Sequence, residues 1–265
     1  MSVVRFLGSM ASGMVLPVRV FLEQTGGMVM LLVWSCVWLV RPPFRYRELM
    51  RQLDFVGAQS TLLIVLTGAF TGMVSALQGY NGLHRYGAES LVGATVALAL
   101  TRELGPVITG LMVIGRVGSA MTTELGAMRN TQQIDALSSM AVDPIQFLVM
   151  PRIVASLLCV PLLAVIFSFS GMVGAYGVCT KYLAIDPGAF MAGIHDYVVA
   201  EDIVHGVVKA VVFGLLMSVV ACHKGFYMTG GARGAGIATT KAVVLSSVLV
   251  LVTDYLMTTL MFKGT

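Results

Sequence analysis

Five apolar stretches of this chain are each long enough to cross a lipid bilayer as a helix. A spanning helix needs about 20 mainly apolar residues. The five stretches are residues 55–83, 90–115, 153–180, 203–222 and 242–262. Only 11% of the 265 residues are charged, against about 25% in an ordinary soluble domain, so the chain cannot cover itself with a water-soluble surface. The sequence predicts an all-α integral membrane protein and disfavours soluble enzymes and nucleic-acid-binding folds.

A sixth apolar stretch, residues 24–40, is at the lower limit of the length required for crossing. It can cross the bilayer, or it can lie along the membrane interface as a helix. Trp34 and Trp38 suit either arrangement, because indole rings favour the boundary between lipid and water.

The distribution of basic residues predicts the orientation of the five spans. Most of the 17 Lys and Arg residues precede the first span or flank the connections from second to third and from fourth to fifth. Only Arg85, Lys181 and Lys263 lie on the opposite side. By the positive-inside rule, the N-terminus is cytoplasmic and the C-terminus is outside.

Cysteine and histidine residues give no sign of a metal site. The four cysteines and four histidines are scattered, with no CxxC pair and no His at metal-ligand spacing. The sequence also contains no convincing internal repeat, which weakens the case for an inverted-repeat secondary transporter. A single membrane domain is the simplest organisation.

The connection between the second and third spans, residues 116–152, is too long and too patterned for a plain connector. Apolar residues recur in it at helical spacing. Asn130 or Thr131 can cap a second helical piece, and Asp143 followed by Pro144 is a good start for a third. We expect short amphipathic helices that lie across the cytoplasmic face.

The pattern leaves two interpretations of this connection open. It is either a re-entrant or interfacial segment that packs on its own bundle, or a docking surface for a soluble partner. In the second case its exposed side carries Glu124, Arg129, Gln132, Gln133 and Asp135.

Several motifs in the chain together resemble those of one known family. QQIDALSSMAVDP at residues 132–144 resembles the signature of the MlaE/YrbE permeases, an EExDA motif followed by a Met-small-x-Asp-Pro ending. Further matches are LQGY at 77–80, RELGPV at 102–107, GRVGSAMTTELGAM at 115–128 and PRI at 151–153. The resemblance extends from about residue 52 to the C-terminus. Gln132 and Gln133 replace the paired Glu of the signature, which resembles the phospholipid-trafficking branch of Gram-negative bacteria more than the actinobacterial Mce importers.

The resemblance implies a permease subunit of an ABC transporter that moves phospholipid between the inner and outer membranes. Such a permease lies in the bacterial inner membrane and works with a cytoplasmic ATPase and a periplasmic Mce-domain lipid-binding protein. A small cytoplasmic accessory protein is a further possible partner. It also implies an interfacial helix, within a cytoplasmic N-terminal region of residues 1–51, followed by a five-span domain over 52–265. The residues expected to couple to the ATPase are Glu124, Arg129, Gln132, Gln133, Asp135, Leu137 and Asp143.

The sequence contains no phosphate-binding loop of the form GxxxxGK[ST]. The glycine-rich residues 230–236 lack the Lys and Ser/Thr that would contact phosphate and Mg²⁺. We therefore expect no cofactor on this chain, with ATP and Mg²⁺ bound by a separate ATPase. Since five spans enclose little space, we also expect a homodimer to form a lipid-sized cavity.

Four charged residues interrupt the predicted spans: Arg102, Glu103, Lys209 and Asp254. Each costs about 2.5–3.5 kcal/mol at the middle of a membrane, so each needs a partner or water. Lys209 and Asp254 reach a similar depth in the outer half of the bilayer, about 9 and 12 Å from the ends of their spans, and we expect them to pair. Arg102 is a deeper alternative partner for Asp254.

A phospholipid needs an apolar trough for its chains and a polar group for its phosphate. Met73, Leu77 and Tyr80 recur at helical spacing along the first span. We expect them to line a lipid cavity together with Arg102 and Glu103. These two charges serve either in structural ion pairs or in direct contact with the headgroup.

Two alternatives come from other functional classes. An intramembrane lipid-modifying enzyme would need clustered His, Asp or Ser groups near one membrane face, and the scattered histidines argue against it. A channel or gradient-driven secondary transporter would leave the docking segment without a purpose.

Overall fold

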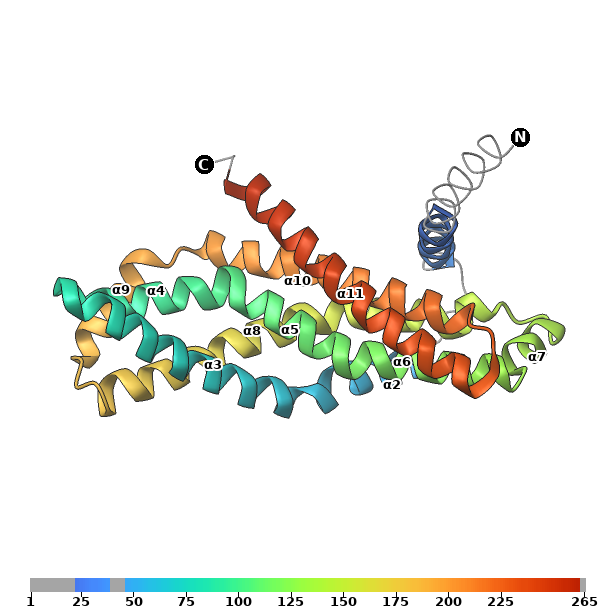
Figure 1. Ribbon diagram of the computed structural model, residues 1–265, viewed down its shortest axis with the longest axis horizontal. Coiled ribbons are helices and arrows are strands. Elements are labelled where there is room, and N and C mark those ends of the chain that lie inside the picture. The colour runs from blue at the N-terminus through green and yellow to red at the C-terminus, as the bar shows by residue number, and fades with distance from the viewer. Residues whose placement is uncertain (1–21, 39–45, 263–265) are drawn as a thin grey trace, which may run out of the picture.

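The computed structural model describes residues 22–38 and 46–262, which form an elongated bundle of helices (Figure 1). The first long segment joins α2 (Tyr46–Leu53), the π-helical turn η1 (Asp54–Ala58) and α3 (Gln59–Leu83). The second joins α4 (Val92–Ala99), η4 (Leu100–Leu104), α5 (Gly105–Val113), η5 (Ile114–Gly118) and α6 (Ser119–Asn130). The third joins η6 (Ile145–Val149) and α8 (Met150–Lys181), and the last two are α10 (Ala200–Phe226) and α11 (Gly231–Phe262).

These five segments are the helices long and apolar enough to cross a membrane in the described part of the chain. They confirm the five predicted spans and the all-α class. Shorter elements connect them: η2 (His84–Tyr86), η3 (Glu89–Leu91), α7 (Gln133–Ser139) and α9 (Pro187–Tyr197). The sequence reading did not predict α9, which packs against α4.

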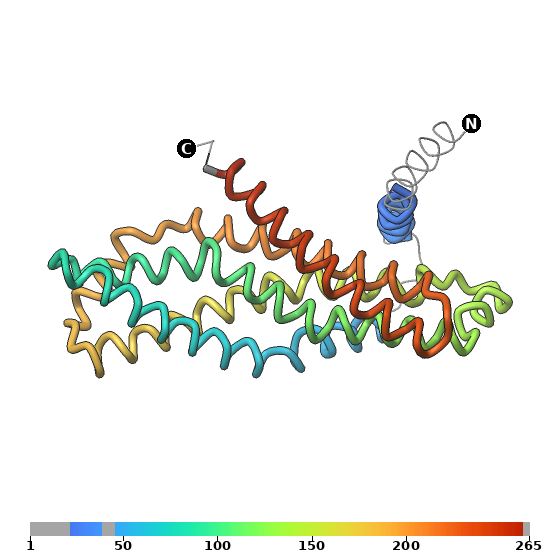
Figure 2. The backbone as a smooth tube through the Cα atoms, in the orientation of Figure 1, coloured from blue at the N-terminus to red at the C-terminus, as the bar shows by residue number. Residues whose placement is uncertain are grey.

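Residues 22–38 form a helix that is seen nearly end on in Figure 2, while the bundle runs across the picture. Its buried side chains Met28 and Leu31 join a cluster with Val219 and Val220 of α10, and Lys224 donates a hydrogen bond to Gln24 Oε1 (2.7 Å). A helix that lies across the bundle axis is the geometry expected of an interfacial helix. The predicted boundary between residues 51 and 52 falls inside α2, and residues 1–21 and 39–45 lie outside the described residues.

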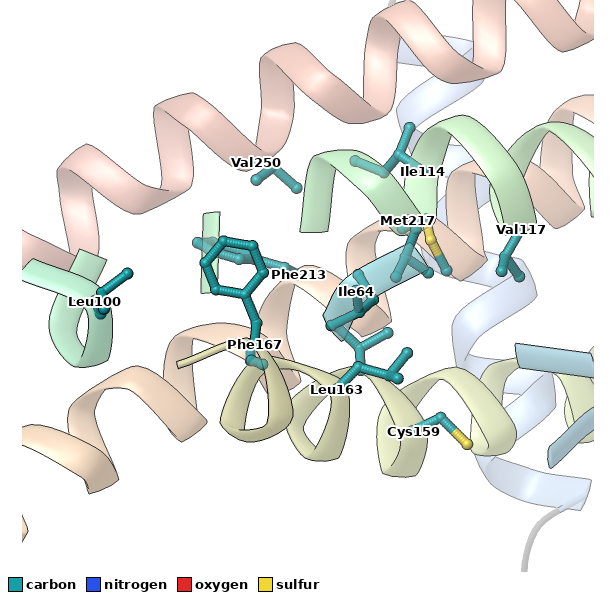
Figure 3. Close-up of a cluster of buried hydrophobic side chains, with 14 of the residues drawn as sticks. Ile64, Leu100, Ile114, Val117, Cys159, Leu163, Phe167, Phe213, Met217 and Val250 are labelled. Carbon is teal, nitrogen blue, oxygen red and sulfur yellow. The ribbon is translucent and has the colours of Figure 1, made fainter. Parts of the chain in front are cut away.

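The core of the bundle is apolar and draws on every long segment. Phe167 of α8 and Phe213 of α10 lie among Ile64, Leu100 and Met217 (Figure 3), and all five are nearly inaccessible to solvent. Large side chains that interdigitate in this way bring the segments into fixed register.

Small residues bring α3 and α8 into backbone contact. A Cβ atom added to Gly72 would lie 1.9 Å from the carbonyl oxygen of Gly171, and one added to Gly68 would lie 2.7 Å from that of Phe167. Glycine is required at such a crossing, because any side chain would overlap the facing backbone.

The structure corrects the prediction for residues 116–152. Residues 119–130 do not lie across the cytoplasmic face as an amphipathic helix: they form α6, which continues the second long segment and packs against α10 and α11. Met121 and Leu125 are fully buried there. Their helical spacing arises because this face of α6 contacts neighbouring helices. Between residues 116 and 152, α7 alone is a short separate α-helix.

The capping predictions in this region had different outcomes. Asp143 Oδ1 accepts hydrogen bonds from the backbone N–H groups of Ile145 (2.8 Å) and Gln146 (3.4 Å), which confirms the predicted helix start. Neither Asn130 nor Thr131 caps α7. The residue before that helix is Gln132, whose backbone is left-handed (φ 57°) and whose side chain makes no capping bond.

Candidate functional site

The four charged residues that interrupt the predicted spans form, together with Asp202, two adjoining ion-pair groups. In the first, Arg102 Nε donates to Asp202 Oδ1 at 2.6 Å, and a second guanidinium nitrogen contacts the same carboxylate. The Asp202 side chain is 2% exposed and that of Arg102 is 33% exposed. Asp202 Oδ2 also accepts a hydrogen bond from the backbone N–H of Val199 (3.0 Å) at the start of α10. One buried carboxylate therefore caps a helix and holds an arginine.

The second group surrounds Lys209 of α10, whose side chain is 2% exposed. Its ammonium group donates hydrogen bonds to Glu103 Oε2 (2.5 Å) and to Thr258 Oγ1 (2.7 Å). The structure also brings it within 3.1 Å of Asp254 Oδ1 on α11, the partner expected from depth. Lys209 thus links three long segments through a buried charge.

The local backbone geometry explains how the adjacent residues Arg102 and Glu103 both find partners on α10. Arg102 and Glu103 lie in η4, a π-helical turn, and such turns displace side chains from their α-helical directions and occur often at functional sites. Their partners Asp202 and Lys209 are two helical turns apart on α10, and therefore on one face of it. The η4 turn and one face of α10 thus form a ladder of charges.

The two groups together contain two cations and three carboxylates, and they leave almost no free space. The hollow among them has a volume of about 10 Å³ and is lined by Arg102, Glu103, His205, Lys209, Thr258 and Met261. A volume of this size holds about one water molecule. Within a single chain, the ladder is a packed ion-pair network.

The sequence reading missed Asp202, because it placed the start of the fourth span at residue 203. The available signal was an acidic residue in the first turn of an apolar run, a position favoured both by helix capping and by the helix dipole. Thr258 was missed too, since a threonine in an apolar helix has no distinctive pattern. Arg102 does not pair with Asp254; it pairs with Asp202.

The five residues predicted to line a lipid cavity do not share one hollow within this chain. Met73 lines a groove between α3 and α8, whereas Arg102 and Glu103 line the small hollow of the charge ladder. Tyr80 stacks on His84 with ring centroids 5.0 Å apart, and Leu77 is half-buried on α3. The lipid cavity is expected in a homodimer, and its lining by these five residues stays a prediction.

The predicted coupling residues gather at the end of the bundle that contains α7. Arg129 pairs with Asp135 at 2.6 Å, and their side chains are 39% and 59% exposed. Gln132 and Gln133 are exposed. An apolar hollow of about 230 Å³ adjoins them, lined by Met128, Gln133, Ala136, Leu137, Met140, Phe147 and Leu148.

Glu124 differs from the other predicted coupling residues. Its carboxylate accepts a hydrogen bond from Arg152 (2.7 Å), which is itself 4% exposed and also donates to the carbonyl of Leu148 (2.6 Å). Glu124 therefore ties α6 to α8, while its side chain stays 42% exposed. Its part in coupling to the ATPase stays a prediction.

Among residues 22–38 and 46–262, no group of three or more His, Cys, Asp or Glu side chains could hold a metal ion. The arrangement of charges is that of a buried ion-pair network in a membrane bundle.

Comparison with known proteins identifies the bundle. The model of the family described as Permease MlaE matches residues 49–260, which include all the residues of the charge ladder and nearly all of the five long segments. The chain belongs to the MlaE permease family.

Relatives of this permease come from bacteria and from a plant. A probable ABC transporter permease protein of Rickettsia felis is 44% identical, covering 85% of this chain and 87% of that protein. The intermembrane phospholipid transport system permease protein MlaE of Haemophilus influenzae is 40% identical, over 81% of this chain and 82% of that protein. The chloroplastic protein TRIGALACTOSYLDIACYLGLYCEROL 1 of Arabidopsis thaliana is 35% identical, over 85% of this chain and 65% of that protein.

Proposed function

We propose that this chain is the permease subunit of an ABC transporter that moves phospholipid between the inner and outer membranes of a bacterium. The observation that carries the proposal is the 40% identity, over most of both chains, to a relative named for intermembrane phospholipid transport. The polar ladder inside an otherwise apolar bundle supports it, because ionisable groups within membrane helices are costly and mark substrate pathways.

The proposed transporter is a homodimer in the inner membrane, with the N-terminus cytoplasmic and the C-terminus periplasmic. The hollow at the charge ladder of one chain has a volume of about 10 Å³, far below the ~300–1,000 Å³ of ordinary ligand sites. At the charge ladder, a lipid-sized cavity therefore requires a second copy. In that dimer, Leu77 and Tyr80 supply apolar wall, and Arg102, which keeps a third of its side chain exposed, contacts the lipid phosphate. Met73 of the predicted set lies instead at the groove between α3 and α8.

Energy comes from a separate cytoplasmic ATPase that binds ATP and Mg²⁺. We place its docking surface at α7 and the adjoining apolar hollow, where Gln133 and Leu137 line the hollow and Asp135 is exposed. A periplasmic Mce-domain protein receives or delivers the lipid, and a small cytoplasmic accessory protein completes the assembly.

The test is lipid transfer by the assembled transporter. The chain is reconstituted with its ATPase and its Mce-domain partner in liposomes, and transfer of fluorescent phospholipid to acceptor liposomes is followed with and without ATP. We expect transfer that requires ATP and that stops when the ATPase carries an inactivating substitution. Transfer driven by an ion gradient without ATP would identify a secondary transporter, and a chemically altered lipid would identify a lipid-modifying enzyme; either result contradicts the proposal.

A further inference from the structure

An apolar groove of about 550 Å³ lies between α3 and α8, away from the charge ladder. Its α3 wall consists of Val65, Ala69 and Met73. Its α8 wall consists of Ile166, Phe169, Ser170, Val173, Gly174, Gly177, Val178 and Lys181. Phe169 and Val173 are well exposed, so the groove opens outward from the bundle.

Only one polar group is available in the groove. Ser170 already donates its hydroxyl hydrogen to the carbonyl of Phe167 (2.9 Å). Lys181 lies in the last turn of α8, is exposed, and makes no ion pair or hydrogen bond with another described residue. The groove thus combines a long apolar floor with a single cation at its end.

The length of the groove matches one leaflet of a bilayer. From Ile166 to Lys181 it follows about 22 Å of helix, at 1.5 Å per residue. Half of a bilayer is about 15 Å of hydrocarbon, or about 20–22 Å when the headgroup region is included. In the predicted orientation, α8 ends on the outer side of the membrane. The apolar floor then spans the outer leaflet, and the ammonium group of Lys181 lies at the level of the lipid headgroups.

Gly177 explains why the groove is open. No heavy atom lies within 4 Å of a Cβ atom built at Gly177, so a side chain there would project into free space. About one turn earlier in α8, a Cβ atom at Gly174 would lie 2.4 Å from the carbonyl oxygen of Ala69. The two helices are thus in contact at Gly174, while Gly177 leaves room beside it.

We propose that this groove binds a phospholipid from the outer leaflet, with one acyl chain along α8 and the phosphate at Lys181. An apolar channel of leaflet length that ends in one cation complements a lipid with an anionic headgroup, because charge-assisted contacts favour phosphate. The inference rests on the proposed function and orientation, and it adds a membrane-facing site at which lipid enters or leaves the transporter.

The experiment maps lipid contacts on the purified full-length chain in lipid discs of phosphatidylethanolamine and phosphatidylglycerol, without ATP. A phosphatidylglycerol with a diazirine on one acyl chain is photoactivated, and labelled peptides are identified by mass spectrometry. We expect strong labelling near Phe169 and Val173. Lys181→Gln should reduce this labelling at least threefold, while Arg85→Gln, which removes another exposed cation predicted on the same side, should not.

A second pair of variants fills the groove. Gly177→Leu places a side chain in it and should reduce labelling at least threefold. Gly82→Leu is the matched control, because its added Cβ also meets nothing within 4 Å but Gly82 lies outside the groove. A diacylglycerol with the same diazirine should label the groove weakly and should be insensitive to Lys181→Gln.

Two results would overturn the site. Equal labelling by phospholipid and diacylglycerol, unchanged in Lys181→Gln and Gly177→Leu, would mean that the groove only faces bulk lipid. Efficient disulfide-linked dimers of Val173→Cys would mean that a second copy of the chain covers it. Either result can occur while the assembled wild-type transporter still moves lipid with ATP, so failure of this site is distinguishable from failure of the proposed function.

Discussion

Asp202 and Arg102, one hundred residues apart in the chain, form a hydrogen-bonded ion pair at 2.6 Å in the bundle. The pair joins the π-helical turn η4 to the first turn of α10. Because Asp202 is almost fully buried, its charge depends on Arg102 and on the backbone N–H of Val199 for compensation.

Substitution of Asp202 tests that dependence. Asp202→Asn keeps an oxygen for the Val199 N–H but removes the charge that pairs with Arg102. We expect the free energy of unfolding to fall by about 2 kcal/mol, less than the ~3–5 kcal/mol of a fully buried pair, because Arg102 is partly exposed. Thermal unfolding in detergent measures the loss. Arg102→Gln combined with Asp202→Asn should cost less than the sum of the two single changes; strict additivity would mean that the pair contributes nothing.

Lys209 should be more critical than either of its acidic partners. Lys209→Met leaves Glu103 and Asp254 as neighbouring carboxylates without a cation, whereas Asp254→Asn leaves the bond from Lys209 to Glu103 intact. We expect Lys209→Met to reduce the yield of folded protein severalfold and Asp254→Asn to reduce it less. Size-exclusion chromatography in detergent quantifies the folded fraction.

A compensated variant gives the decisive comparison for this group. Lys209→Met with Glu103→Gln and Asp254→Asn removes all three charges and should recover most of the yield lost in Lys209→Met, because no unpaired charge remains buried. A triple variant no better folded than Lys209→Met would show that the loss comes from altered packing.

Charge reversal at α7 tests the docking surface. Asp135→Arg should leave the permease folded but prevent the ATPase from copurifying, because this exposed carboxylate lies beside the apolar hollow. Met140→Asp, at a rim residue that is 72% exposed, should have the same effect without disturbing an ion pair. Arg129→Asp combined with Asp135→Arg is the control. If the reversed pair restores copurification, the loss came from the internal bond between these residues, and direct docking at Asp135 is contradicted.

The crossing of α3 and α8 predicts a large difference between two glycines. Gly72→Ala should severely reduce the yield of folded protein, because its Cβ would overlap the Gly171 carbonyl at 1.9 Å, and overpacking costs about 1–3 kcal/mol or more where the backbone cannot move. Gly177→Ala, whose Cβ meets nothing within 4 Å, should fold normally. Expression and thermal unfolding of the two variants provide the comparison, and equal behaviour would refute the close crossing.

The class of this protein and the location of its membrane segments can be predicted from its amino-acid sequence alone. Long apolar runs permit little except membrane helices, because backbone polar groups in lipid must bond within their own segment. Because that constraint acts within each segment, it predicts a membrane helix without knowledge of which other helices pack against it. Motifs such as the one at residues 132–144 likewise sufficed to indicate the family.

Which charged residues pair with one another depends on how the helices pack. The sequence showed that Arg102 and Glu103 need partners, but the choice of Asp202 and Lys209 depends on the π-helical turn η4 and on the packing of α10 beside it. The same limit explains α6: spacing predicted a helix at Met121 and Leu125, but an amphipathic pattern is the same whether its apolar face contacts lipid or another helix. Helical periodicity indicates that one face of a helix is apolar. Whether lipid or another helix covers that face depends on the packing of the whole bundle.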